Sequence, residues 1–354
     1  MKRVLFVCLA LSNGGAERVV SVLSDSLMRA GMEIFILPLT DRKQAYSVDE
    51  KIHILKLEKQ INGIAGKVNR IIGIRRSIKT HNIDTVIAFS NYNVMYSAIA
   101  SIGLNVKVIG SERNDPAQED GRRLFCWLRL MLYRRINGLV CQTEDARAYF
   151  PESIQRKSTV IPNPITDNLP EPYYGCRTHR VVSFSRLEPQ KNIPMLINAF
   201  KAFHKDYPDY ILELYGDGSL KDTLIKYVKD NKLENCVKIY PFVNDIHERV
   251  RDASMFALAS DYEGLSNAMI EAMALGLPTI VTDCPCGGAR MVIKDGKNGL
   301  LVPVGDATSM SEAMKKIASD ADFSAELSEN GIKIKDILKK EKIAKQWEEV
   351  IERC

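Results

Sequence analysis

Short apolar runs alternate with amphipathic segments along the whole chain of 354 residues. Each apolar run predicts a buried strand, and the apolar positions at helical spacing between the runs predict helices. Strands are expected near residues 3–9, 33–38, 52–57, 84–89, 106–110, 138–141, 158–161, 180–185, 210–215, 236–240, 255–259, 279–282 and 299–301. Helices are expected near residues 15–30, 64–80, 92–102, 121–136, 144–149, 193–205, 219–230, 245–251, 267–275, 288–293 and 306–318, with helical turns continuing to the end. Strands that alternate with helices form βαβ units, so the pattern predicts an α/β protein with mostly parallel, doubly wound sheets.

One stretch breaks the alternation. Residues 161–180 lack a hydrophobic period and are rich in Pro, Asn and Tyr, so they are typical of a linker. The chain length also favours two domains, each with its own core. We expect an N-terminal domain over 1–165, a linker over 166–178, a C-terminal domain over 179–338 and a final helix over 339–354.

The most informative loop follows the strand expected at 255–259. It leads into a helix that begins at Ser266 or Asn267, both of which are good N-caps. The loop lies at the carboxyl end of a strand, where open α/β sheets bind ligands, and the helix N-terminus suits a phosphate. Two carboxylates bracket this unit, because Glu263 lies in the loop and Glu271 lies on the otherwise apolar helix.

This stretch closely resembles the Glu-x7-Glu signature of the retaining glycosyltransferases of family 4. The resemblance covers both glutamates and extends to the Glu-Ala-Met-Ala-x-Gly-x-Pro string that begins at Glu271. It implies the GT-B fold, in which an N-terminal acceptor-binding and a C-terminal donor-binding Rossmann-like domain face a central cleft that holds a nucleotide-sugar donor. It also implies that the final helix crosses back onto the N-terminal domain. By resemblance, Glu263 is a catalytic residue that binds the transferred sugar, and Glu271 binds the ribose hydroxyls. The loop residues that would also bind the donor are Gly264, Leu265 and Ser266.

A second loop carries two cations five residues apart. An arginine fork and a lysine point charge on one loop can grip a diphosphate, and Arg186 and Lys191 resemble the family's Arg-x4-Lys phosphate clamp. Gly216 closes the next strand, in a string that lacks the third glycine of a nicotinamide fingerprint. The resemblance suggests that Phe242 and Val243 hold the base.

Polar clusters also follow strands in the first domain. Gly14, Gly15 and Arg18 belong to a Gly-Gly-Ala-Glu-Arg string that looks like the family's N-terminal loop near the donor diphosphate, and we place Arg18 on the acceptor side. The other residues expected on the acceptor side are Ser90, Asn91, Glu112, Arg113 and Asn114. Some relatives have a histidine where Arg113 stands. Because a guanidinium stays protonated and cannot act as a base, this difference leaves the acceptor-side chemistry open.

The eight cysteines and five histidines show no metal-ligand spacing. We therefore expect reduced thiols, a cytoplasmic protein and no metal site. We also expect no cofactor, because the resemblance makes the nucleotide sugar a substrate. No run approaches the roughly 20 apolar residues of a membrane span.

Charge is distributed unevenly along the chain. Residues 1–170 carry 24 Lys and Arg against 16 Asp and Glu, whereas residues 171–354 carry 25 against 28. Two amphipathic segments, 60–80 and 121–138, contain basic residues but no acidic ones. Such segments either pack one face on a sheet and solvate the other, or bind an anionic membrane surface. Because related family members act on lipid-linked sugars, we expect peripheral membrane association. The sequence has no basic motif interleaved with aromatic residues, so we do not expect it to bind nucleic acid.

The family resemblance, together with these patterns, implies a retaining, metal-independent hexosyltransferase. It would move a sugar from a nucleoside-diphosphate sugar, a UDP-hexose or UDP-N-acetylhexosamine, to a lipid-linked or growing surface glycan. A sugar-nucleotide epimerase or a hydrolase on the same scaffold, and a non-catalytic sugar-nucleotide binding protein, are the alternatives. Hydrolysis would leave the phosphate clamp unexplained, and the intact glutamate pair argues against a silent binder.

Overall fold

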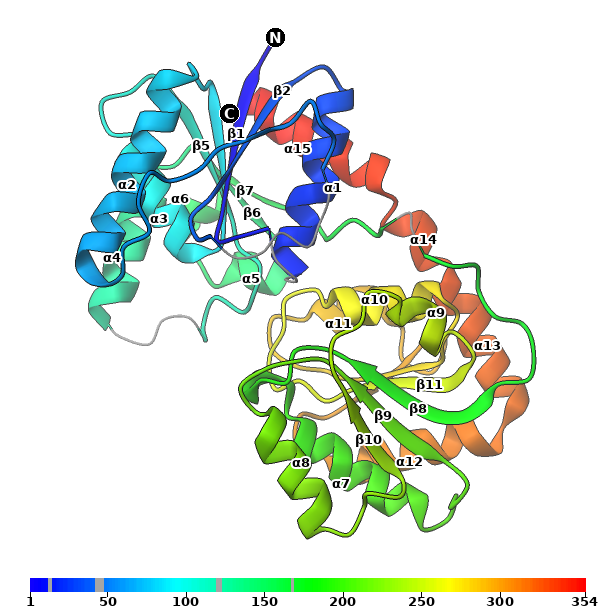
Figure 1. Ribbon diagram of the computed structural model, residues 1–354. Coiled ribbons are helices and arrows are strands. Elements are labelled where there is room, and N and C mark those ends of the chain that lie inside the picture. The colour runs from blue at the N-terminus through cyan, green and yellow to red at the C-terminus, as the bar shows by residue number, and fades with distance from the viewer. Residues whose placement is uncertain (12–14, 42–47, 119–122, 167–168) are drawn as a thin grey trace. The chain divides into compact units, whose positions relative to one another are not determined.

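The computed structural model of the chain describes residues 1–11, 15–41, 48–118, 123–166 and 169–354. These residues form two compact units: unit 1 contains Met1–Pro164 and Leu338–Cys354, and unit 2 contains Ile165–Ile337. Figure 1 shows both units, with the red C-terminal helix packed in unit 1. The linker expected over 166–178 falls within unit 2, and its last residue, Thr178, already begins a strand.

Unit 1 is built on one sheet in which every pair of neighbouring strands in the described part of the chain is parallel. Its strands are β1 (Arg3–Cys8), β2 (Glu33–Pro38), β3 (His53–Ile54), β4 (Thr85–Phe89), β5 (Lys107–Ser111), β6 (Gly138–Cys141) and β7 (Ser158–Val160). Their spatial order is β3-β2-β1-β4-β5-β6-β7, so the order reverses between β1 and β4. Open α/β sheets bind ligands beyond the carboxyl ends of the strands at such a switch point.

Helices cover both faces of this sheet (Figure 1). They are α1 (Gly15–Arg29), α2 (Gly63–Thr80), α3 (Asn91–Ala100), α4 (Arg123–Tyr133), α5 (Glu144–Ala148), α6 (Glu152–Gln155) and the C-terminal α15 (Lys340–Arg353). On one face, α1 and α15 pack together, and Trp347 of α15 is fully buried against the strands. On the other face, α3 packs between α2 and α4. Because both faces are covered, the strands read as continuous apolar runs.

Unit 2 repeats this plan with a second parallel sheet. Its strands are β8 (Thr178–Phe184), β9 (Ile211–Tyr215), β10 (Val237–Tyr240), β11 (Ala253–Leu258), β12 (Thr279–Thr282) and β13 (Leu300–Val302). Its helices are η1 (Pro189–Lys191, a 3-10 turn), α7 (Ile193–His204), α8 (Lys221–Asp230), α9 (Ile246–Val250), α10 (Asn267–Ala274), α11 (Gly288–Val292), α12 (Ala307–Ser319), α13 (Ala321–Ile332) and α14 (Ile334–Ile337). The strand order is β10-β9-β8-β11-β12-β13, so β8 and β11 meet at the switch point.

The core of unit 2 lies mainly between its sheet and the helices α7, α8 and α12. Alternate residues of β11, such as Met255 and Ala257, point into this cluster, while α9, α10 and α11 cover the opposite face (Figure 1). Two Rossmann-like units with parallel sheets confirm the predicted fold class. No helix within the described ranges is both long enough and apolar enough to cross a bilayer.

Candidate active site

The two loops singled out in the second half of the sequence are spatial neighbours. One leaves β8 and carries Arg186 and Lys191, and the other leaves β11 and carries Glu263. Because β8 and β11 are paired and parallel, both loops emerge from the same edge of the sheet at its switch point. The topology alone therefore brings the predicted clamp and the predicted catalytic glutamate together.

Hydrogen bonds join these loops into one structure. The backbone N–H of Asp261 donates to the carbonyl of Gln190 (2.9 Å), and Nε2 of Gln190 donates to the carbonyl of Tyr262 (2.8 Å). Nδ2 of Asn192 donates to Oδ1 of Asp261 (2.7 Å). Asn192 also caps α7 from a left-handed backbone conformation (φ 42°). These four contacts fix the chain on both sides of Lys191, so its position is set before a ligand arrives.

Lys191 and Glu263 form an ion pair at the centre of this structure, from Nζ to Oε1. Both side chains are largely buried, at 9% and 14% exposed. Oγ of Ser260 donates to the same carboxylate oxygen at 2.8 Å. A cation and an anion held side by side in a protected place can bind, respectively, a phosphate oxygen and a sugar hydroxyl.

Arg186 differs from Lys191 because it is exposed. Its Nη2 donates to Oε1 of Gln190 at 3.3 Å, the same glutamine that binds the Glu263 loop. The arginine fork is therefore oriented by the loop pair while its head stays open to solvent. Among the described residues, no three His, Cys, Asp or Glu side chains gather closely enough to hold a metal ion.

The second glutamate of the signature lies on α10. Ser266 is the N-cap of this helix, and its hydroxyl accepts a hydrogen bond from the N–H of Met269 (3.4 Å), as the sequence predicts. Glu271 is buried, at 5% exposed. Its Oε2 lies 2.9 Å from Nε2 of His247, a residue of α9.

Close backbone contacts shape the remaining donor-side loops. A Cβ at Gly216 would lie 1.9 Å from the carbonyl oxygen of Ser185, and one at Gly288 would lie 1.8 Å from that of Gly264. Only glycine fits at these two positions. Phe242 is exposed, and its N–H donates to Oδ2 of Asp217 (3.0 Å) in the loop after Gly216.

A small cavity lies under the Glu263 loop. The polar or small residues that line it include Ser260, Glu263, Gly264, Ser266, Thr282 and Cys284. Burial, followed by the nearby Glu263 carboxylate, raises the pKa of the Cys284 thiol to about 12. This thiol is therefore protonated at neutral pH and is not a nucleophile. Leu265 and Val243, the other predicted donor residues, are buried and half-buried.

The polar clusters of unit 1 gather in the same way at their own sheet edge. β1, β4 and β5 are neighbours, so the residues after them emerge together. Gly14 lies outside the described residues, while Gly15 and Arg18 occupy the first turn of α1. Ser90 has an unusual backbone (φ 76°, ψ 149°). Its N–H donates to the carbonyl of Ser111 (3.0 Å), which holds the strained turn in place. Asn91 follows it and is buried.

Glu112 has partners inside unit 1. Its carboxylate accepts a hydrogen bond from the hydroxyl of Tyr133 and lies 3.6 Å from Nη2 of Arg129, and all three side chains are buried. Arg129 therefore ties α4 to the sheet and does not face solvent, although it belongs to the predicted basic segment. In this structure Glu112 positions α4. Asn114, two residues further, is partly exposed.

Arg113 is held above two aromatic rings. Its guanidinium carbon lies 4.7 Å from the ring centre of Phe89 and 5.6 Å from that of Trp347. Nη1 donates to Oδ1 of Asn163 (2.8 Å), which also accepts a hydrogen bond from Nε2 of Gln142 (2.7 Å). Burial lowers the pKa of Arg113 to about 9, so it remains charged at neutral pH. The sequence did not single out Asn163, Gln142 and Trp347 as neighbours of Arg113, because they follow other strands or lie on the last helix.

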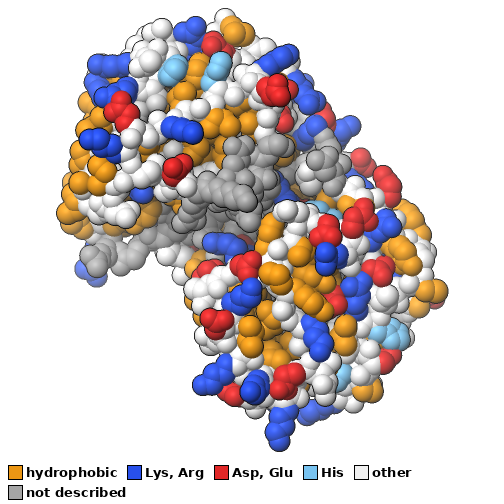
Figure 2. All heavy atoms as spheres, in the orientation of Figure 1, with side chains coloured by type: hydrophobic (Ala, Val, Ile, Leu, Met, Phe, Trp, Pro, Cys, Tyr) orange, Lys and Arg blue, Asp and Glu red, His pale blue; other side chains and the backbone are white. Residues whose placement is uncertain are grey.

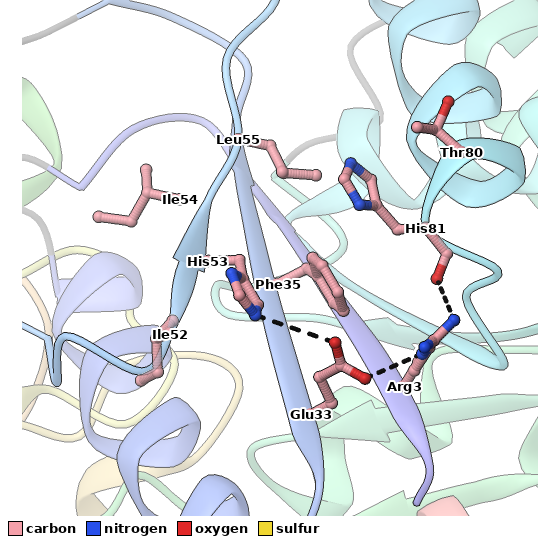
Figure 3. A pocket seen from close by; sticks show the side chains of 9 residues that line it. All are labelled: Arg3, Glu33, Phe35, Ile52, His53, Ile54, Leu55, Thr80 and His81. Atoms are coloured by element: carbon pink, nitrogen blue, oxygen red, sulfur yellow. Dashed lines mark hydrogen bonds and ion pairs between the residues drawn. The ribbon is translucent and has the colours of Figure 1, made fainter.

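A wide depression lies at the opposite end of the unit 1 sheet (Figure 3). There the ring of Phe35 lies between the imidazoles of His53 and His81, and Glu33 pairs with Arg3. These residues begin strands or end a helix. The depression is therefore at the amino edge of the sheet and contains none of the predicted site residues.

Comparisons with known proteins agree with this geometry. Residues 13–169 match the family model Glycosyltransferase Family 4, and residues 177–334 match Glycosyl transferases group 1. An uncharacterized glycosyltransferase of Haemophilus influenzae is 25% identical over 355 residues, covering 99% of this chain and 100% of the relative. The GalNAc-alpha-(1->4)-GalNAc-alpha-(1->3)-diNAcBac-PP-undecaprenol alpha-1,4-N-acetyl-D-galactosaminyltransferase of Campylobacter jejuni is 24% identical, covering 93% of this chain and 92% of the relative.

A solved structure supports the fold. Anabaena HepE, crystallised with UDP and glucose, superposes with a TM-score of 0.85 at 20% identity, and the match covers 99% of this chain and 100% of that one. With a family 4 domain in its first half and a group 1 domain in its second, the chain belongs to the GT-B glycosyltransferases that combine these two domains.

Proposed function

We propose that this glycosyltransferase is a retaining, metal-independent hexosyltransferase that uses a UDP-hexose or UDP-N-acetylhexosamine and a lipid-linked or growing glycan acceptor. The observation that carries the proposal is the switch point of unit 2. Two loops from paired strands are joined there by hydrogen bonds, and the joined loops hold Arg186, Lys191 and Glu263 in one place.

Each of these three residues has a role in the proposed reaction. The departing diphosphate gains negative charge as the bond to the sugar breaks, and Arg186 and Lys191 stabilise that charge. Glu263 is paired to Lys191, so the hydroxyls of the transferred sugar bind next to the cation that holds the diphosphate. The N-terminus of α10 adds a positive dipole end. We assign the removal of the acceptor proton to a diphosphate oxygen, in a front-face transfer that retains the anomeric configuration.

The nucleotide occupies the remaining donor-side loops in this proposal. Glu271 binds the ribose hydroxyls, Phe242 and Val243 hold the base, and Gly216 and Gly264 allow the backbone to approach the ligand. The HepE structure supports UDP as the nucleotide, because that protein was crystallised with UDP and glucose.

The acceptor assignment rests on unit 1 and on one relative. The Campylobacter jejuni relative is named for a glycan joined to undecaprenol through a diphosphate. Unit 1 also has an exposed apolar surface, which we call the α2–α4 face. It consists of Ile64, Val68, Ile72, Leu124, Trp127, Leu128 and Met131. We propose that this face binds the cytoplasmic surface of an anionic membrane, where a lipid-linked acceptor resides.

Other functions on the same scaffold predict different products. A hydrolase would release free sugar without an acceptor, an epimerase would convert one nucleotide sugar into another, and a silent binder would do neither. The first test is a thermal-shift panel of nucleoside-diphosphate sugars. Product analysis with a polyprenyl-diphosphate-linked acceptor follows, with the anomeric configuration read by NMR.

Variants then test the assigned residues. Glu263→Gln keeps the size of the side chain, and Arg186→Ala removes an exposed group, so both should fold normally while transfer falls by about 100-fold or more. Arg156→Ala, an exposed arginine of unit 1, is the matched control and should keep full activity. Normal transfer by Glu263→Gln and Arg186→Ala would contradict the assignment, and the absence of binding to every nucleotide sugar would contradict the function.

A further inference from the structure

Glu271 is an acidic residue in an apolar setting. It lies on α10 between Ile270 and Ala272, and all three residues are buried. A carboxylate removed from water needs hydrogen-bond donors, because burying a charge without a partner is costly. Helix α10 itself carries no basic residue that could pair with this carboxylate.

A histidine of the preceding helix, α9, supplies the hydrogen-bond donor. Nε2 of His247 lies 2.9 Å from Oε2 of Glu271, and the histidine side chain is only 12% exposed. Because an ionised carboxylate can only accept a hydrogen bond, Nε2 carries the hydrogen in this contact. The imidazole is held in turn by Phe184, the last residue of β8, which it meets edge-on at 87° with ring centres 6.1 Å apart.

This arrangement connects three elements at the sheet edge. Phe184 ends the strand that leads into the Arg186 loop, His247 lies in the first turn of α9, and Glu271 lies on the helix that follows the Glu263 loop. The histidine therefore sets the orientation of the glutamate relative to both catalytic loops. Supporting residues that lock a ligand-binding side chain in this way commonly control affinity.

We propose that His247 is a positioning residue for nucleotide binding: it holds the Glu271 carboxylate in the orientation that binds the ribose hydroxyls. This inference rests on the proposed function, because it takes the ribose as the ligand of Glu271. His247 itself touches no reacting atom. Its loss should therefore raise the KM of the donor while leaving kcat nearly unchanged.

A ligand series separates this role from a general effect on folding. Binding of UDP and of 2′,3′-dideoxy-UDP is measured by calorimetry for the full-length wild type, His247→Ala and His247→Gln. For the wild type, removing the ribose hydroxyls should weaken binding by about 10- to 100-fold. His247→Ala should bind UDP about 10-fold more weakly but dideoxy-UDP as the wild type does. His247→Gln should recover much of the loss, since its amide can donate to Glu271.

Two further variants complete the test. Adding His247→Ala to Glu271→Ala should cost nothing beyond Glu271→Ala alone if both residues act on the same hydroxyls. His179→Ala, an exposed histidine of unit 2, is the control and should bind both ligands normally. An equal loss of both ligands in His247→Ala, or no loss of either, would overturn the inference. A wild type that binds neither nucleotide would instead overturn the proposed function.

Discussion

Arg113 is a half-buried cation whose guanidinium has few partners. Its Nη1 is bound by Asn163, but within the described parts of the chain its buried Nε and Nη2 have no hydrogen-bond acceptor. No carboxylate is paired with it among the described ion pairs, whereas the neighbouring Glu112 pairs with Arg129. Unpaired buried charges destabilise a fold, so their presence usually serves function.

We therefore predict that Arg113→Met stabilises the fold and impairs transfer. Methionine keeps the packing against Phe89 and Trp347, and Asn163 remains bonded to Gln142 after the guanidinium is removed. The free energy of unfolding should rise by about 1–2 kcal/mol, and activity with a lipid-linked acceptor should fall by about 10-fold or more. Denaturant unfolding and a transfer assay measure the two effects. A less stable variant would show that the arginine is structural.

The difference in unfolding free energy between Arg113→Met and the wild type should depend on pH, and the sign of this dependence can be predicted. Burial lowers the pKa of Arg113 to about 9, below the usual value of a free arginine, so the unfolded chain holds this proton more tightly than the folded one. Stability should therefore rise as pH increases through about 9. The gain from Arg113→Met should be full at pH 8 and smaller at pH 10. A difference that stays constant between these two values would contradict the shift.

Gly288 tests the rigidity of the proposed donor site. A Cβ at this position would collide with the carbonyl of Gly264, next to Glu263, so Gly288→Ala must displace the Glu263 loop. We expect UDP binding to weaken by about 10-fold or more, with a loss of about 1–3 kcal/mol in stability. Gly331→Ala is the control, because a Cβ on this residue of α13 would make only ordinary contacts, with Met273 and Asn298. Isothermal titration with UDP distinguishes the two, and equal affinities would show that the loop yields freely.

At the scale of elements, α15 is the part of unit 1 that comes from the far end of the chain. Trp347 is fully buried, Nζ of Lys2 donates to the carbonyl of Ile351 (3.0 Å), and Nη2 of Arg353 donates to Oγ1 of Thr159 (2.6 Å). The helix thus completes the core of unit 1, although it follows unit 2 in the sequence.

Trp347→Ala should therefore destabilise unit 1 selectively. The cost of the cavity is about 3–5 kcal/mol, and Trp347→Phe should cost less because the ring contact with Phe89 is kept. Proteolysis with mass spectrometry monitors the unfolding of unit 1. The stabilisation that UDP confers monitors the unfolding of unit 2. Protection of unit 2 by UDP should survive in Trp347→Ala. Loss of UDP binding in this variant would mean that α15 also supports unit 2.

The hydrophobic pattern predicted most elements because both sheets are covered on both faces. In such sheets each strand is a continuous apolar run, as β4 and β11 show, and each helix shows one buried stripe. The cap at Ser266 was predictable for a different reason, since helix starts depend on local chemistry. Strand order was harder to foresee, because no local pattern records that β8 pairs with β11.

In the candidate site, too, local sequence strings were predictable, whereas contacts between distant segments were not. Arg186, Lys191 and Glu263 were predictable because each lies in a loop with a distinctive string. His247 was not, because its importance depends on a contact with Glu271, 24 positions away in the sequence. The burial of Arg129 was equally hidden, since only the fold brings Glu112 to it. Long-range pairing, and not residue type, decides the role of these side chains.

At the scale of the whole molecule, the α2–α4 face is the feature that bears on location. The apolar residues of α2 that face outward recur at i, i+4 and i+8, and Ile64 among them is 81% exposed. Lys67, Arg123, Arg134 and Arg135 are exposed on the same two helices or just after them. Figure 2 shows orange and blue side chains together on the α2 and α4 side of unit 1. An exposed apolar surface with basic residues around it suits an anionic lipid surface.

We predict that the protein binds vesicles containing phosphatidylglycerol through this face. The chain has two tryptophans, Trp127, which is 59% exposed, and the fully buried Trp347. Binding should therefore shift the emission of Trp127 to shorter wavelengths as its ring enters the interface. Because each basic residue near the surface contributes about 1 kcal/mol, Arg134→Glu/Arg135→Glu should weaken binding by about 30-fold or more.

Two controls separate insertion from nonspecific attraction. Leu124→Ala should reduce binding even at low salt, because it removes apolar area, whereas Ile225→Ala on α8 of unit 2 removes a comparable exposed group and should have no effect. High salt should weaken binding of the wild type to anionic vesicles, since the basic residues lose their attraction when screened. Equal binding to neutral and anionic vesicles would show that the basic residues do not contribute to binding. Unchanged Trp127 emission on bound vesicles would show that the α2–α4 face is not the contact.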